Sequence, residues 1–167
     1  VFTTKTRTLL KIKPLQLSGN LENDRSIVHK LADGIHKLLF SKEGIAKSHI
    51  LFSVQTGTHE KWRSEIWECD WDGGNAHQLT QENNYSITPA YFPAKSGFHV
   101  NKFLYVSYRN GAPKIFLAQS GESIGKPLVA LRGNQLLPTV CRDRSKLAFI
   151  SDAGGRADLF VQKIDVE

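Results

Sequence analysis

A repeated segment in the second part of the chain constrains the fold more than any other feature of the sequence. The stretch HVNKFLYVSYRNGAPKIFLAQSGES aligns with DRSKLAFISDAGGRADLFVQKIDVE, and upstream Pro89 matches Pro138. The further aligned pairs are Lys102 with Lys146, Phe103 with Leu147, Tyr105 with Phe149, Ser107 with Ser151, Gly111 with Gly155, Ile115 with Leu159 and Phe116 with Phe160. An earlier copy, KSHILFSVQTG followed by SEIWECDWDGGN, places Ser53 at the position of Ser107. Copies of roughly 40–50 residues have the period of a four-stranded propeller blade.

Each copy contains a short, continuous apolar run: ILF, FLYV or LAFI. A strand with one face in water alternates apolar and polar residues, whereas a strand covered on both faces is apolar throughout. The inner strands of a propeller lie between neighbouring blades. Turn signals separate the runs, at Asp72-Gly73, Asn110-Gly111 and Gly154-Gly155. We therefore expect a mainly β fold, a partial propeller with about three blades at residues 47–82, 83–132 and 133–167.

The stretch CDWDGGNAHQLT allows three interpretations: the end of a WD40 blade, a calcium loop, or a plain turn. A WD40 blade also carries Gly-His near its start, which no copy has. A calcium loop needs ligands at fixed positions after Asp70 and Asp72, but Gly74 and Gln81 stand there instead. The stretch is therefore interpreted as a hairpin turn, with Trp71 at a strand end.

The first residues of the chain have a different pattern. Residues 9–17 alternate in part, as in an edge strand, and a helical stripe of apolar residues follows. The stripe consists of Ile27, Val28, Leu31, Ile35, Leu38 and Leu39. Asn23 or Asp24 is expected to cap the start of the helix, and Gly44 lies beyond its end. Because one strand and one helix cannot enclose a core, residues 1–46 are expected to be the C-terminal end of an α/β domain whose beginning lies outside this chain.

Composition excludes several classes of protein. Hydrophobic residues make up 40% of the chain and charged residues 23%, as in an ordinary globular protein. The formal net charge of +6 is scattered, without the concentrated basic stripe of a nucleic-acid binder, so no nucleic-acid partner is expected. The sequence has no apolar run of about 18 residues, the length that spans a membrane.

Motifs for catalysis and metal binding are missing from the sequence. The six histidines form no H-E-x-x-H pair, and no G-x-S-x-G nucleophile elbow occurs. Cys69 and Cys141 lack the CxxC spacing of zinc and redox sites, and Cys69 has the context of a buried thiol. We expect no catalytic residues, no metal and no cofactor, and hence a binding protein rather than an enzyme.

Three stretches of the chain resemble the TolB family, soluble envelope proteins of the bacterial Tol-Pal system. The family's helix-to-propeller junction matches HKLADGIHKLLFSKEGIAKSHILF, with His29, Asp33, Ile35, Leu38 and Gly44. Its first-blade turn of Asp, aromatic, Asp, Gly, any residue and Asn matches residues 70–75, and KLAFISDAGGRADLFV fits the later blades. The chain departs from the family at the Ser-Pro-Asp-Gly turn, of which only Pro93 and Asp143 remain.

The resemblance implies a known architecture and role. Members of the family have an N-terminal α/β domain and a six-bladed propeller, so this chain corresponds to the end of the first domain and about half a ring. It further implies a periplasmic protein, peripheral to the envelope membranes, that binds the peptidoglycan-associated lipoprotein Pal and communicates with inner-membrane Tol proteins. Outer-membrane integrity, cell division and colicin uptake are the processes it would support.

The resemblance also implies where the partner binds. In the family, Pal contacts cluster on loops just before the inner strand of each blade, which correspond here to NNYSIT (83–88) and GNQLL (133–137). The candidate partner-binding residues are Asn83, Asn84, Tyr85, Ser86, Asn134, Gln135 and Leu136. They combine apolar anchors with polar side chains, as recognition surfaces do. The other interpretation is that Leu136, Leu137 and Ile87 only pack between blades.

Two further hypotheses stay open at the level of sequence. The chain has the pattern of the substrate-gating propeller of a prolyl-oligopeptidase-like serine peptidase, whose hydrolase domain would lie outside it. A piece of a propeller also leaves strand edges and blade faces uncovered, and such edges pair readily. We therefore expect the isolated chain to associate with itself, as a dimer.

Overall fold

The computed structural model describes residues 2–3, 8–9, 14–58, 61–93 and 101–165. The chain divides into two compact units. The helical unit comprises Val1–Ile50 with Cys69–Ala76, and the blade unit comprises Leu51–Glu68 with His77–Glu167. Each unit is described by itself.

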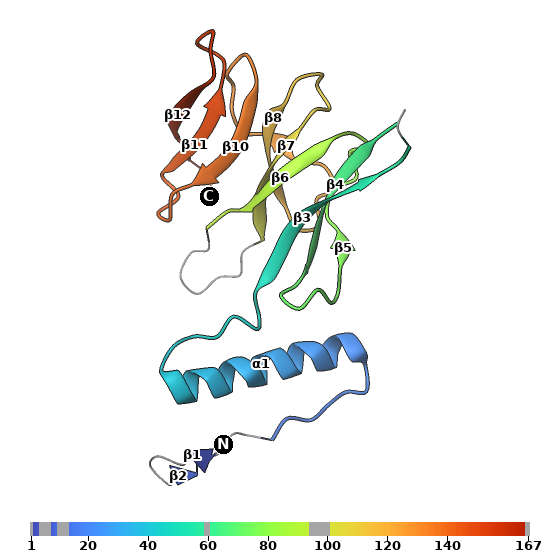
Figure 1. The fold of residues 1–167 in the computed structure, drawn as a ribbon, viewed down its shortest axis with the longest axis vertical. Helices are drawn as coiled ribbons and strands as arrows, with labels where there is room; N and C mark the ends of the chain where they lie inside the picture. The colour runs from blue at the N-terminus through green and yellow to red at the C-terminus, as the bar shows by residue number, and fades with distance from the viewer. Residues whose placement is uncertain (1, 4–7, 10–13, 59–60, 94–100, 166–167) are drawn as a thin grey trace. The chain divides into compact units, whose positions relative to one another are not determined.

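The described residues form one helix and several short strands, drawn in Figure 1. In chain order these are β1 (Phe2–Thr3), β2 (Thr8–Leu9), α1 (Leu21–Phe40), β3 (His49–Thr56), β4 (Arg63–Asp70), β5 (His77–Gln78), β6 (Ser86–Tyr91), β7 (Lys102–Ser107), β8 (Lys114–Gln119), β9 (Lys126–Pro127), β10 (Gln135–Val140), β11 (Lys146–Ser151) and β12 (Asp158–Lys163). Strands β1 and β2 pair with each other. The fold is mainly β, as the sequence predicts.

The remaining strands form three successive antiparallel sheets, in which neighbouring strands follow one another along the chain. The first blade is β3-β4-β5, the second is β6-β7-β8-β9, and the third is β10-β11-β12. This meander, repeated in the order of the sequence, is the arrangement of a partial propeller. It confirms the expected fold class.

The second and third blades repeat each other closely. In the second, Ser86 pairs with Ser107 and the register shifts after Ile87; in the third, Gln135 pairs with Ser151 and the register shifts after Leu136. The bulge in each blade holds a residue with positive φ directly before a proline, Thr88 at 49° and Leu137 at 51°. The alignment of Pro89 with Pro138 is therefore a structural equivalence as well as a sequence match.

Strand β7 lies between two apolar clusters and is buried on both faces. Leu104 and Val106 pack with residues of the third blade, whereas Phe103 and Tyr105 pack toward the first. The prediction of a doubly covered strand is thus confirmed for FLYV.

The same prediction is only partly right for LAFI and wrong for ILF. In β11, Leu147 and Phe149 are buried but Ala148 and Ile150 are half-buried, and in β3, Ile50 is exposed. The reason is that β3 and β11 belong to the first and last blades of this chain, where a neighbouring sheet covers one face only among the described residues.

The three expected turns are present. Gly73, Gly111 and Gly155 all have left-handed φ angles, of 81°, 85° and 97°. Each glycine N–H donates to the carbonyl three residues earlier, at 2.9 Å. Only glycine adopts this conformation without steric cost, so the sequence signal and the geometry agree.

The helical unit differs from expectation at both of its predicted elements. Helix α1 begins earlier than expected, because Asn20 is its N-cap and accepts a hydrogen bond from Asn23 N at 3.1 Å. Asp24 instead accepts from Ser18 N at 2.6 Å. In the predicted strand over 9–17, residues 14–17 have no regular structure, and residues 10–13 lie outside the described ones.

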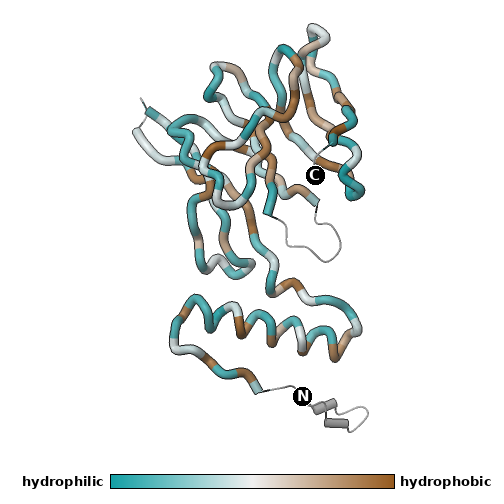
Figure 2. Tube along the Cα trace, turned by 180° about the vertical axis from the view of Figure 1, so that it is seen from behind, coloured by the Kyte–Doolittle hydropathy of each residue, from teal (hydrophilic) through white to brown (hydrophobic). Residues whose placement is uncertain are grey.

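The apolar stripe of α1 is present but is not buried as a core stripe would be. Brown hydrophobic segments recur along the helix between teal ones in Figure 2. Val28, Leu38 and Leu39 are exposed, and the only buried residue of α1 is Asp33. The polar face of the helix therefore makes the closest contacts in this unit.

Candidate interaction surface

Two connectors of equal length carry the sequence-predicted site. Connector 1, residues 79–85, joins β5 to β6, and connector 2, residues 128–134, joins β9 to β10. Because each leads into the first strand of a blade, both lie at the end of the blade unit where β6 and β10 begin, the connector end (Figure 1). The fold thus brings the predicted loops to one surface.

Connector 1 is held by hydrogen bonds to β4. Asn83, with a left-handed φ of 54°, donates from its backbone to Glu65 Oε1 at 2.7 Å. Its side-chain oxygen accepts from Arg63 Nη1 at 3.1 Å. The backbone oxygen of Asn84 accepts from Ser64 N at 2.9 Å. Asn83 is exposed and Asn84 half-buried, so polar groups face solvent from a fixed backbone.

Tyr85 ends connector 1 and is half-buried. Its ring meets Tyr108 edge to face, with the ring centroids 5.6 Å apart, and its carbonyl accepts from Tyr108 N at 3.0 Å. Edge-to-face packing of this kind fixes an aromatic side chain while leaving part of its face accessible.

Connector 2 is fixed by an equivalent but polar pair. Asn134 donates to Asp152 from its backbone at 2.6 Å and from its side chain at 2.7 Å. In the repeat, Asn134 and Asp152 occupy the positions of Tyr85 and Tyr108, because each pair adjoins the first residue pair of its sheet. A Cβ atom on Gly133 would lie 2.2 Å from Asp152 Oδ1, so glycine permits this approach.

The other predicted residues support the connectors from within. Ser86 and Gln135 are fully buried. The Gln135 side chain accepts from Ile115 N at 3.1 Å and donates to the Leu131 carbonyl at 2.8 Å. Leu136 is half-buried against the apolar cluster of the second and third blades. Ser86 and Gln135 therefore position the loops from the interior, whereas Leu136 keeps part of its side chain exposed to solvent.

A buried ion pair that sequence reasoning missed anchors connector 1 to the second blade. Glu82 Oε1 accepts from Arg109 Nη1 at 2.7 Å and from the Tyr105 hydroxyl at 2.6 Å. Arg109 also donates to the Gly125 carbonyl at 2.7 Å, and its guanidinium lies 4.0 Å from the centroid of the Phe116 ring. Burial and the nearby Glu82 carboxylate raise the pKa of Tyr105, so its hydroxyl remains a donor.

The signal that could have revealed this pair lies in the repeat. The positions of Glu82, Tyr105 and Arg109 are occupied in the third blade by Leu131, Phe149 and Ala153. Three polar groups of one copy are therefore replaced together by apolar ones in the other. Such a concerted change indicates mutual contact.

Two residues of the junction pattern, Asp33 and Gly44, lie side by side in the helical unit. Asp33 accepts from Ala46 N at 2.8 Å and Lys47 N at 3.2 Å. A Cβ atom on Gly44 would lie 2.1 Å from Asp33 Oδ1, which explains the glycine. The pattern thus encodes a sharp turn after the helix, closed by one buried carboxylate.

The first-blade turn belongs to the same unit and contacts the helix. Asp72 pairs with Arg25 at 2.6 Å and with His29 at 3.2 Å, and Gly74 N donates to it at 3.1 Å. The hydrogen bond from Gly74, together with those from His29 and Arg25, holds the pKa of Asp72 below its ordinary value of 3.8. Asp72 is therefore a contact of the helix as well as a turn residue.

The part of the chain that the structure describes has neither a cluster of metal ligands nor a helix suited to span a membrane. Within the described ranges, no group of three or more His, Cys, Asp or Glu side chains is arranged to hold a metal ion. The one long helix of that part of the chain is too polar to cross a membrane.

Comparison with known proteins shows which proteins the chain is similar to. No family model matches the sequence. The TolB homolog of Protochlamydia amoebophila is 46% identical over 170 residues, covering all of this chain and 36% of that protein. Over nearly its whole length, the chain is similar to curated TolB homologs. The TolB homolog of Chlamydia muridarum is 40% identical over 158 residues, which are 93% of this chain and 36% of that protein.

The chain spans only about a third of the length of these curated TolB relatives, 36% in each case. A crystal structure of TolB from Acinetobacter baumannii matches 97% of this chain and 39% of that one, with a TM-score of 0.74. Because the two sequences are 17% identical, this match shows the shared fold alone. The fold agrees with the blades and the helix described above.

Proposed function

We propose that this chain is part of a non-enzymatic periplasmic scaffold of the Tol-Pal system that binds Pal through the connector end. The observation that carries the proposal is the convergence of both sequence-predicted loops on this one end. Asn83, Tyr85 and Asn134 are held there by internal hydrogen bonds or ring contacts. Loops fixed before binding lose little conformational entropy when a partner docks.

The wider role follows from the family and remains part of the proposal. The protein would be peripheral to the envelope membranes and would communicate with inner-membrane Tol proteins. It would support outer-membrane integrity and cell division, and serve colicin uptake. In this view residues 1–46 end an N-terminal α/β domain and residues 47–167 belong to the propeller. The gating propeller of a serine peptidase, the other hypothesis, is not proposed, because the relatives named above are TolB homologs.

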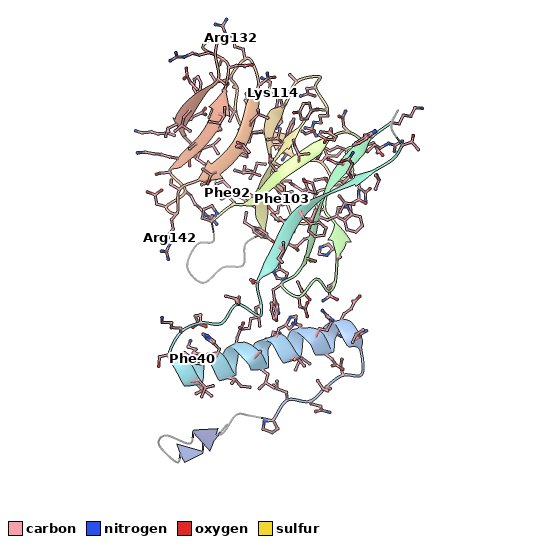
Figure 3. The ribbon with its side chains drawn as sticks, viewed as in Figure 1. Phe40, Phe92, Phe103, Lys114, Arg132 and Arg142 are labelled. Atoms are coloured by element: carbon pink, nitrogen blue, oxygen red, sulfur yellow. The ribbon has the colours of Figure 1, made fainter. Side chains whose placement is uncertain are left out.

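Binding calorimetry with the full-length protein and the soluble domain of Pal tests the proposal. Tyr85→Ala and Asn134→Ala should each weaken binding about tenfold, the loss typical of a moderate hot spot. Arg142→Ala is the control, since Arg142 is exposed and lies toward the other end of the blade unit in Figure 3. Circular dichroism would verify that all variants fold. Wild-type affinity in both connector variants would remove these loops from the Pal site.

We also propose that the isolated chain associates with a second copy of itself. Strand β12 is the last strand of its sheet, and its Leu159 and Val161 are 68% and 63% exposed. An exposed apolar edge strand offers unpaired backbone groups and apolar surface to another chain. Light scattering should show a dimer at high concentration, and Val161→Lys should favour the monomer. A monomer at every concentration would contradict self-association.

A further inference from the structure

Three carboxylates at the connector end, those of Glu65, Glu82 and Asp152, are turned inward and already hydrogen-bonded, whereas Asp158 is exposed and paired with Arg156. Glu65 is buried and accepts from Thr80 Oγ1 at 2.6 Å as well as from the connector 1 backbone. The Glu82 side chain is fully buried and paired with Arg109. Both carboxylate oxygens of Asp152 accept hydrogen bonds from Asn134. The negative charge of these three carboxylates therefore serves the loops internally and offers little to a partner.

The basic side chains at the same end have the opposite arrangement. Arg63 is exposed and bonds only a neutral amide, that of Asn83. Arg132 is exposed on connector 2, at the position that Asn83 takes in connector 1. The ion pairs near this end join Arg109 to Glu82 and Arg156 to Asp158; among the described residues none includes Arg63, Lys114 or Arg132.

Lys114 fixes the loop that carries Arg132. Its ammonium group donates to the carbonyl oxygens of Leu131, at 2.8 Å, and Gly133. These two residues flank Arg132, so the backbone of Arg132 is held on both sides while its guanidinium stays in solvent. In Figure 3, Arg132 and Lys114 lie at one end of the blade unit and Arg142 lies toward the other. The arrangement presents a cation on a rigid support.

We propose that the connector end recognises carboxylate groups of its protein partner, with Arg132 and Arg63 as the contacts. This rests on the proposed function, because it specifies the chemistry of the surface that Pal would offer there. A guanidinium binds a carboxylate through two parallel hydrogen bonds, which gives both strength and orientation. Charge complementarity of this kind raises the association rate and depends on salt.

Charge-reversal variants at the two ends of the blade unit distinguish a local carboxylate site from the effect of the protein's net charge. Arg132→Glu and Arg142→Glu change the net charge equally, and both positions are exposed. They differ only in the end of the unit at which the charge is altered. The probes are the soluble domain of Pal and a deca-glutamate peptide, titrated into the full-length protein at about 50 mM and about 300 mM NaCl, conditions that differ in screening length. Arg132→Gln serves as a milder second variant.

The inference expects Arg132→Glu to weaken binding of both probes about tenfold or more at low salt, and Arg142→Glu to change it less than about twofold. If Pal binds but the two charge reversals have equal effects, the inference is overturned and the proposed function stands. If Pal does not bind the wild type, the proposed function fails. The titration with the deca-glutamate peptide then tests the carboxylate site on its own. Loss of peptide binding with Arg132→Glu alone supports the carboxylate site; equal loss with both variants overturns it.

Discussion

Arg109 donates to Glu82 across 2.7 Å, and the Glu82 side chain has no exposed surface. The pair joins connector 1 to the turn between β7 and β8, so it fixes the loop on which Asn83 and Tyr85 stand. Breaking a buried ion pair leaves one charge without compensation, whereas replacing the whole group by apolar residues can be nearly neutral.

The repeat supplies the apolar replacement for this group. Glu82→Gln should lower the free energy of unfolding by about 3 kcal/mol, because Arg109 then lacks its carboxylate. The triple variant Glu82→Leu, Tyr105→Phe, Arg109→Ala gives these three positions their third-blade residues and should recover part of that loss, because the Ser86 and Ser107 hydroxyls, which also donate to Glu82, remain. Urea denaturation of the full-length protein measures both changes. A triple variant less stable than Glu82→Gln would contradict the equivalence of the two blades.

Gly44→Ala should destabilise the helical unit. The added Cβ would lie 2.1 Å from Asp33 Oδ1 and 3.0 Å from Asp33 Cα, so the carboxylate must leave the Ala46 and Lys47 amides. Losing the partner of a buried amide costs about 1–3 kcal/mol. Gly34→Ala is the control, since nothing lies within 4 Å of its Cβ position and alanine favours the helix. The midpoint temperature of thermal unfolding should fall for Gly44→Ala and rise slightly for Gly34→Ala.

Gly133→Ala should lower both the stability of the fold and the affinity for the partner. Comparison with Gly111→Ala separates the effect of the Asp152 contact from that of backbone strain. Both glycines have positive φ, 74° and 85°, so alanine is strained at either site. Only at Gly133 would the new atom also displace Asp152, which holds Asn134. The stability loss should be about 1–3 kcal/mol larger at Gly133. Equal losses, measured by denaturant unfolding, would show that the Asp152 contact contributes nothing.

The acid sensitivity of the helical unit should depend on Asp72. Its pKa is held below 3.8 by the Gly74 amide, with His29 and Arg25 adding to the effect. A lowered pKa in the folded state means that this contribution to stability is complete above about 3.8, the ordinary value for Asp, and disappears as the pH falls through the lower folded value. In a carbon-13 NMR titration, Arg25→Gln should raise the pKa of Asp72. Lys30→Gln, on the exposed part of the helix, should leave it unchanged, and equal shifts in the two variants would argue against the Arg25 contact.

Local signals in the sequence were sufficient for the turns and the middle blade. Glycine at Gly73, Gly111 and Gly155 has one dominant structural use, and the apolar run at Phe103–Val106 requires cover on both faces. The expectation for the runs in β3 and β11 was too general, because burial depends on whether a neighbouring sheet exists. The pattern of a strand predicts which of its faces are apolar, but it does not show whether a neighbouring sheet covers them.

Contacts between distant residues were beyond the reach of local patterns. The Glu82–Arg109 pair joins residues from different parts of the chain, and the sequence next to either residue does not predict the contact. The helix start was misplaced because Asn20, Asn23 and Asp24 are all good caps, and only the geometry distinguishes them. Among the predicted site residues, Ser86 and Gln135 are polar by type but buried by position.

Amide hydrogen exchange of the full-length protein, with and without the soluble domain of Pal, tests the central claim most directly. Our account predicts slower exchange in the complex at residues 81–85 and 131–134 of the two connectors. Loop 141–145, whose Arg142 lies toward the other end of the blade unit in Figure 3, should exchange at an unchanged rate. Protection confined to this loop, with both connectors unaffected, would contradict the account.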